Sequence, residues 1–180
     1  MVYGHSYIGV ALMNNRLVWA AVFIASAGLL GFGLYLQHVD HLDPCPLCIL
    51  QRYAFIATGL VGLVAAVHNP RSVGQTVYAV TLIVFAGIGA AIAGWHVWLQ
   101  YTPRRNVFEC GPGLDYMLET FPLSKALPMI FKGSGDCANI DWSFLGLSIP
   151  GWSLVCFILL ILGGLGLLTR VPRLPKHATS

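Results

Sequence analysis

The cysteines are the residues of this chain with the most evident chemistry. Cys45 and Cys48 enclose two residues in the motif Cys-Pro-Leu-Cys, whereas Cys110 and Cys137 stand 27 positions apart. Cys-x-x-Cys spacing is typical of thiol redox pairs, and a disulfide across so short a gap closes almost no loop and adds little stability. We therefore interpret Cys45 and Cys48 as a redox-active pair, and an even number of exposed cysteines in an oxidising compartment suggests two disulfides.

Two alternatives to redox chemistry stay open at this point. Structural disulfides are one, because a bond between Cys110 and Cys137 would stabilise its loop by roughly 3–4 kcal/mol. A zinc site at the Cys-x-x-Cys motif is the other, although no second Cys-x-x-Cys supports it. Its further ligands would come from four nearby residues, namely His38, Asp40, His41 and Asp43.

The residues around Cys48 favour the redox interpretation. Asp43 or a neighbour can cap a helix whose first turn suits Pro44 and Pro46. Cys48 then lies at a helix N-terminus, where the helix dipole favours thiolate over thiol. Arg52 follows one turn later on the same helical face. A snorkelling arginine is the ordinary explanation, but we expect Arg52 to hold Cys48 as thiolate and to bind an electron-poor ligand.

A dithiol that oxidises others repeatedly must pass its electrons on. The chain contains no dinucleotide fingerprint and no Cys-x-x-Cys-His haem attachment signal. A lipid-soluble acceptor is left, and a quinone is the obvious candidate. His96 and Gln100 are four residues apart on one helical face, and both can hydrogen-bond a carbonyl oxygen, so we expect them to line a quinone site. Ordinary polar residues at a membrane interface are the alternative.

Composition indicates the elements that must position these residues. The 180-residue chain is 57% hydrophobic and 9% charged, whereas soluble domains carry about 25% charged residues. Four apolar runs are long enough to cross a bilayer as helices. We predict an all-α membrane protein, a four-helix transmembrane bundle that forms one domain over residues 1–180. The predicted helices are 17–36, 49–67, 76–99 and 150–168, with loops 37–48 and 100–149 on one side.

The distribution of charge predicts the orientation of this bundle. All seven acidic residues lie in the two loops 37–48 and 100–149. The other side carries basic residues and no acid, and lysine and arginine mark the cytoplasmic side. We therefore expect cytoplasmic N and C termini, with membrane lipids around the helices, and no nucleic-acid-binding surface. The basic residues of this side are Arg16, Arg71, Arg170, Arg173 and Lys176.

Taken together, these features resemble the DsbB family of disulfide bond formation proteins. The resemblance rests on four apolar helices, Cys-x-x-Cys with Arg52 four residues on, the His-x-x-x-Gln pair, and Cys110 with Gly-Ser-Gly-Asp-Cys137. It extends over residues 17–168. It implies a multi-pass enzyme of the bacterial inner membrane, with periplasmic cysteines, that reoxidises a periplasmic DsbA-like protein of thioredoxin fold.

The resemblance also implies a role for each site residue. A DsbA thiolate would attack a Cys110–Cys137 disulfide and form a mixed disulfide at Cys110. Cys137 would then exchange with Cys45, and Cys48 would pass the electrons to ubiquinone or menaquinone. The quinone would be bound by Arg52, His96 and Gln100.

Three other functions are compatible with the sequence. One is a relative with the same chemistry that serves a single dedicated partner, and another is an enzyme similar to vitamin K epoxide reductase. The third is a non-catalytic membrane scaffold with structural disulfides.

Overall fold

The computed structural model describes the backbone of residues 4–41, 44–101, 122 and 142–169, and the side chains from Asn15 onward within these ranges. Cys110 and Cys137 lie outside the described residues, so their predicted pairing stays a prediction. The predicted division into one domain over residues 1–180 likewise stays a prediction.

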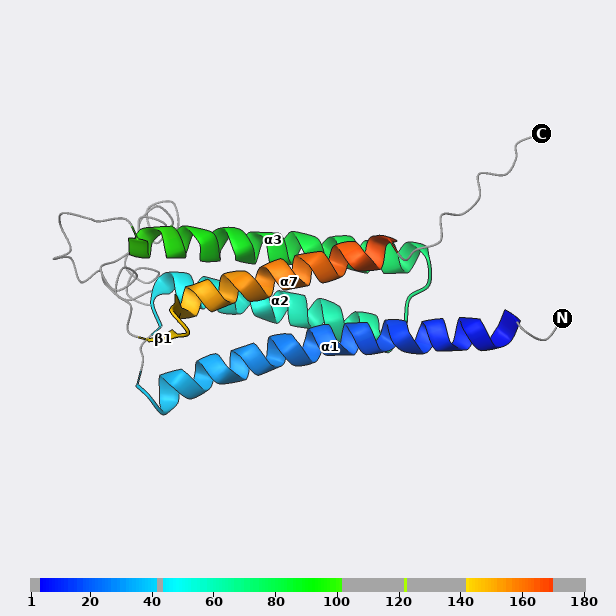
Figure 1. The fold of residues 1–180 in the computed structure, drawn as a ribbon, viewed down its shortest axis with the longest axis horizontal. Coiled ribbons are helices and arrows are strands. Elements are labelled where there is room, and N and C mark those ends of the chain that lie inside the picture. The colour runs from blue at the N-terminus through cyan, green and yellow to red at the C-terminus, as the bar shows by residue number, and fades with distance from the viewer. Residues whose placement is uncertain (1–3, 42–43, 102–121, 123–141, 170–180) are drawn as a thin grey trace, which may run out of the picture.

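Four long helices run side by side along the molecule (Figure 1). They are α1 (Gly4–His38), α2 (Pro46–His68), α3 (Val73–Tyr101) and α7 (Ile149–Thr169). Each contains a segment long and apolar enough to cross a membrane, which in α1 is Asn15–His38. The predicted all-α, four-helix membrane fold is confirmed.

The helices extend beyond the apolar runs that predicted them. The largest difference is at α1, which begins at Gly4 instead of residue 17. Residues 4–16 contain no proline, and a helix propagates easily from an existing turn. The length of the apolar run therefore matches the thickness of a bilayer, whereas the helix itself continues until a residue ends it.

The two central helices of the bundle are α2 and α3, with α1 packed on α2 and α7 packed on α3. At Gly89 of α3, an added Cβ would overlap the Phe157 ring of α7. Phe157 also stacks on Phe55 of α2, with ring centroids 4.0 Å apart and an interplanar angle of 12°. Glycine at position 89 thus lets one aromatic ring join three helices.

One end of the bundle gathers the candidate residues, and we call it the cysteine end. Here α1 and α3 finish while α2 and α7 begin (Figure 1). A short antiparallel hairpin, β1 (Ser143–Phe144) and β2 (Leu147–Ser148), leads directly into α7. Its two turn residues, Leu145 and Gly146, have φ of 52° and 80°, as a two-residue type I′ turn requires. The sequence predicted only an irregular loop here, because two-residue strands carry no periodicity.

Candidate functional site

The cysteine pair stands at the first turn of α2. Cys45 is the N-cap residue, with φ −65° and ψ 162° and no side-chain capping bond, and Pro46 begins the helix. The sequence predicted Asp43 or a neighbour as the cap, with Pro44 and Pro46 in the first turn. Asp43 is outside the described residues, and Pro44 precedes the cap. Helix geometry carries Cys48 back over Cys45, so that Sγ of Cys45 donates to Sγ of Cys48 at 3.3 Å.

The two thiols differ in their surroundings. The Cys45 side chain is buried among Leu47 and Leu99, whereas Cys48 is half-buried. Their sulfur atoms are close enough for a disulfide to form with a small movement, since the bond length is about 2.05 Å. The pair can therefore exist as dithiol or disulfide without rearranging the helix.

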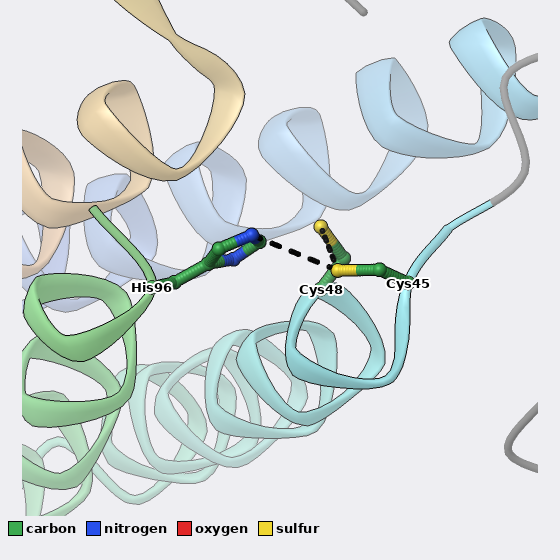
Figure 2. Close-up of side chains that lie close together, drawn as sticks. All are labelled: Cys45, Cys48 and His96. Carbon is green, nitrogen blue, oxygen red and sulfur yellow. Dashed lines mark hydrogen bonds between the residues drawn. The ribbon is translucent and has the colours of Figure 1, made fainter. Parts of the chain in front are cut away.

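His96 of α3 reaches across to this pair (Figure 2). Its Nε2 lies 3.7 Å from Sγ of Cys45, and its Nδ1 lies 3.1 Å from Nε2 of Gln51. The exposed fractions of His96 and Gln51 are 2% and 3%. An imidazole in van der Waals contact with a buried cysteine sulfur can influence the charge on that sulfur directly.

Arg52 points from α2 toward the last turns of α1. Its Nη1 donates to Oε1 of Gln37 at 2.6 Å, and its Nη2 donates to the carbonyl oxygen of Gly33 at 3.0 Å. Both acceptors are neutral, and no carboxylate in the described ranges pairs with the guanidinium. The arrangement orients the cation through two neutral acceptors.

Gln100 is fixed by the hairpin. Oγ of Ser148 in β2 donates to Oε1 of Gln100 at 2.6 Å. With its oxygen engaged in this way, the Gln100 amide has its N–H groups left to offer to a ligand.

A cavity of about 350 Å³ lies between the helices at the cysteine end, within the usual range for small-molecule sites of about 300–1,000 Å³. Both cysteines open onto it, and so do Arg52, His96 and Gln100. Most of the remaining lining is apolar. Its aromatic members are Phe32, Phe55, Trp142, Phe144 and Trp152.

Three of these aromatic side chains cover the cavity beside the hairpin. Trp142 meets Phe32 of α1 edge-on at 5.9 Å and stacks on Phe144 at 6.1 Å. Nε1 of Trp152 donates to the carbonyl oxygen of Phe144 at 3.0 Å. The flat apolar walls and few polar groups suit a planar ring that carries carbonyl oxygens.

The structure thus brings five sequence-predicted site residues to one cavity: Cys45, Cys48, Arg52, His96 and Gln100. It adds Gln51, Gln37 and Ser148, which sequence reasoning gave no role. The sequence could have indicated a role for Gln51, because a polar residue inside an apolar membrane helix needs a hydrogen-bond partner.

The same geometry bears on metal binding. Ligand atoms of Cys45, Cys48 and His96 all lie within 4.8 Å of one another. Structural zinc takes four protein ligands, and the described ranges supply no fourth to this group. His38, considered as a ligand from the sequence, instead places Nδ1 3.0 Å from the carbonyl oxygen of Leu34. His38, Asp40 and His41 are exposed, so the histidine beside the cysteines is His96.

Comparison with known proteins decides the family. Residues 15–166 match the family described as "Disulfide bond formation protein DsbB". The chain belongs to the DsbB family. Among its relatives is the disulfide bond formation protein B of Hahella chejuensis, 54% identical over 82% of this chain and 90% of the relative. That of Azoarcus sp. is 54% identical over 80% and 86%, and that of Marinobacter nauticus is 51% identical over 88% and 94%.

Membership of the DsbB family gives the chain a general function. It is a disulfide bond formation protein, and its four apolar helices make it a multi-pass membrane protein. A thiol pair that opens onto a largely apolar cavity between such helices is in keeping with thiol oxidoreductase chemistry.

Proposed function

We propose that the protein reoxidises a DsbA-like periplasmic thiol oxidase and passes the electrons to a membrane quinone, ubiquinone or menaquinone. One observation carries this proposal. The sulfur atoms of Cys45 and Cys48, 3.3 Å apart, open onto an apolar cavity that also holds the cation of Arg52. A disulfide-forming site needs an electron acceptor, and this cavity has the size and polarity for one.

In this proposal the dithiol loses two electrons and two protons and becomes a disulfide. A bound quinone would supply an acceptor for both, with its carbonyl oxygens becoming hydroxyls. DsbA is a strong oxidant at about −120 mV, so the acceptor must be at least as oxidising, as respiratory quinones are. The residues that would hold the acceptor are Arg52, Gln100 and His96.

Each of these residues has a distinct part. Arg52 stabilises negative charge in the cavity, first on the Cys48 sulfur and then on the acceptor oxygen, because its cation is oriented and pairs with no acid among the described residues. Gln100 offers amide N–H groups from an orientation fixed by Ser148. His96 forms the wall beside Cys45.

The proposed route from the soluble partner uses Cys110 and Cys137. A partner thiolate attacks their disulfide and bonds to Cys110, releasing Cys137 as thiolate. Cys137 attacks Sγ of Cys45 in the Cys45–Cys48 disulfide, and Cys48 leaves with the electron pair. The position of Cys48 supports this order, because it lies within α2 one helical turn before Arg52, whereas Cys45 is the N-cap residue.

We also propose that the cysteine end faces the periplasm and that both termini are cytoplasmic, in a bacterial inner membrane. Asp40 follows α1 at the cysteine end. Arg71 lies in the turn between α2 and α3 at the opposite end, and Asn15, next to Arg16, reaches Pro70 there. Basic residues at one end and acid at the other support this orientation.

The test is a turnover assay with purified full-length protein, a reduced DsbA-like substrate and a short-chain ubiquinone, following quinone reduction. Cys48→Ser should abolish turnover, and Arg52→Ala should raise the quinone concentration needed for half-maximal rate at least tenfold. Tyr53→Phe is the matched control beside Arg52, since that side chain is 63% exposed. Undiminished turnover in Cys48→Ser would refute the proposal.

A further inference from the structure

The hydrogen bonds around His96 determine which ring nitrogen carries its proton. Nε2 of Gln51 is a donor only, and it lies 3.1 Å from Nδ1 of His96. With the Gln51 amide in this orientation, Nδ1 is the acceptor and carries no proton. In a neutral imidazole the proton then sits on Nε2.

This tautomer directs a donor at a cysteine. Nε2 of His96 lies 3.7 Å from Sγ of Cys45, so its N–H points to the sulfur. Cys45 in turn donates its S–H to Sγ of Cys48 at 3.3 Å. Three hydrogen bonds thus run in one direction, from Gln51 through His96 and Cys45 to Cys48.

Burial makes this direction costly to reverse. Gln51 and His96 are only 3% and 2% exposed, and both line the cavity. With the Gln51 amide oriented as it is, a proton on Nδ1 would face the amide N–H, so that two donors would confront each other without an acceptor. Nε2 would also become an acceptor and withdraw the donor from Cys45.

We propose that Gln51 is a positioning residue that holds His96 in the Nε2–H tautomer, so that His96 stabilises Cys45 whenever its sulfur bears negative charge. The inference rests on the proposed function, because Cys45 must join and leave disulfides during exchange. Once the partner's second thiolate has displaced Cys110 and left as the oxidised partner, the Cys110 thiolate attacks Sγ of Cys137 in the Cys45–Cys137 mixed disulfide, and the bond to Cys45 breaks. Cys45 then leaves with the electron pair, and His96 donates a hydrogen bond to it without giving up its proton.

The proposal gives His96 a task besides lining the acceptor site. Its ring nitrogens face Gln51 on one side and Cys45 on the other. Gln51 also lines the cavity, so loss of Gln51 should slow sulfur exchange more than it weakens binding of the acceptor.

The test reads the tautomer directly. Full-length protein with ¹⁵N-labelled histidine is reduced and studied by NMR in bilayers, and the His96 signals are assigned by their loss in His96→Asn. The wild type should show a protonated Nε2 and a bare Nδ1. Gln51→Met should show protons distributed over both nitrogens, whereas Gln51→Glu, whose carboxylate accepts, should place a proton on Nδ1. Gln75→Met, a matched change at the far end of α3, should leave the spectrum as in the wild type.

Turnover provides the second readout. Gln51→Met should lower the rate at saturating quinone about tenfold, with a much smaller change in the quinone KM. A wild-type proton on Nδ1, or an unchanged His96 spectrum in Gln51→Met, would overturn the inference even if the enzyme turns over normally. A wild type that does not reduce quinone would overturn the proposed function instead, while the tautomer is still read independently.

Discussion

Oε1 of Gln37 accepts a hydrogen bond of 2.6 Å from Nη1 of Arg52, and this contact joins the last turn of α1 to α2. The carbonyl oxygen of Gly33, one helical turn earlier, accepts from Nη2 of the same guanidinium. Two acceptors on one helix fix both the position and the plane of the cation. The C-terminal end of α1 therefore contributes to the candidate site through Arg52.

Gln37→Leu should weaken binding of the acceptor. The guanidinium would lose one of its two anchors, and a hydrogen bond to a charged group contributes about 1.5 kcal/mol or more, which corresponds to about a tenfold rise in quinone KM. Steady-state kinetics with a short-chain ubiquinone measure this change. Tyr35→Phe, two residues away on an exposed position, should behave as the wild type. A quinone KM that is the same in Gln37→Leu and the wild type would contradict this role.

Gly89→Ala should destabilise the bundle. The added Cβ would overlap Phe157, which is fully buried and already stacked on Phe55, and overpacking of this kind costs about 1–3 kcal/mol. Thermal unfolding in detergent should show a lower Tm. Gly87→Ala is the matched control, because a Cβ there meets nothing within 4 Å. Equal Tm values for the two variants would show that the close packing of Gly89 against Phe157 does not determine the stability of the bundle.

Cys156 should report on occupancy of the cavity. Its side chain is half-buried and belongs to the cavity lining. In the oxidised enzyme, where the redox pair is protected as disulfide, an apolar maleimide should alkylate Cys156. A saturating quinone should slow this labelling several-fold. Mass spectrometry of the peptide measures the rate, and labelling that is indifferent to quinone would place the acceptor elsewhere.

Ser148→Ala should affect the acceptor more mildly than Gln37→Leu. The Gln100 amide would lose the 2.6 Å bond that orients it, and a neutral hydrogen bond contributes about 0.5–1.5 kcal/mol. The quinone KM should rise about two- to tenfold with little change in kcat. Ser143→Ala, on the same hairpin but exposed, supplies the comparison. A drop in kcat alone would point to a different role for Ser148.

Much of the fold could be predicted because a bilayer imposes simple requirements. A helix that crosses it needs about 20 apolar residues, and α2, α3 and α7 each extend the predicted runs by only one to three residues per end. The hairpin before α7 could not be predicted, because its geometry depends on φ at Leu145 and Gly146 rather than on a hydrophobic pattern.

The site was predictable where its residues share a helix. Cys45, Cys48 and Arg52 lie within two turns of α2, so their spacing alone placed them together. Contacts between residues of different helices could not be predicted from spacing. His96 was expected to face a quinone, but its distance to Cys45 depends on how α3 packs against α2. The partner of Gln51 could not be named for the same reason, although its polarity indicated that one exists.

The neutral anchoring of Arg52 has a consequence for the thermodynamics of electron transfer. A cation held by an amide and a carbonyl, with no carboxylate from the described residues beside it, maintains a positive potential over the cavity. In a low-dielectric interior such a potential acts strongly, and it favours whatever has just gained an electron. We therefore expect a bound acceptor to have a higher reduction potential here than the same molecule free in the bilayer. The charge of Arg52 would then favour electron transfer from the sulfur atoms to the acceptor.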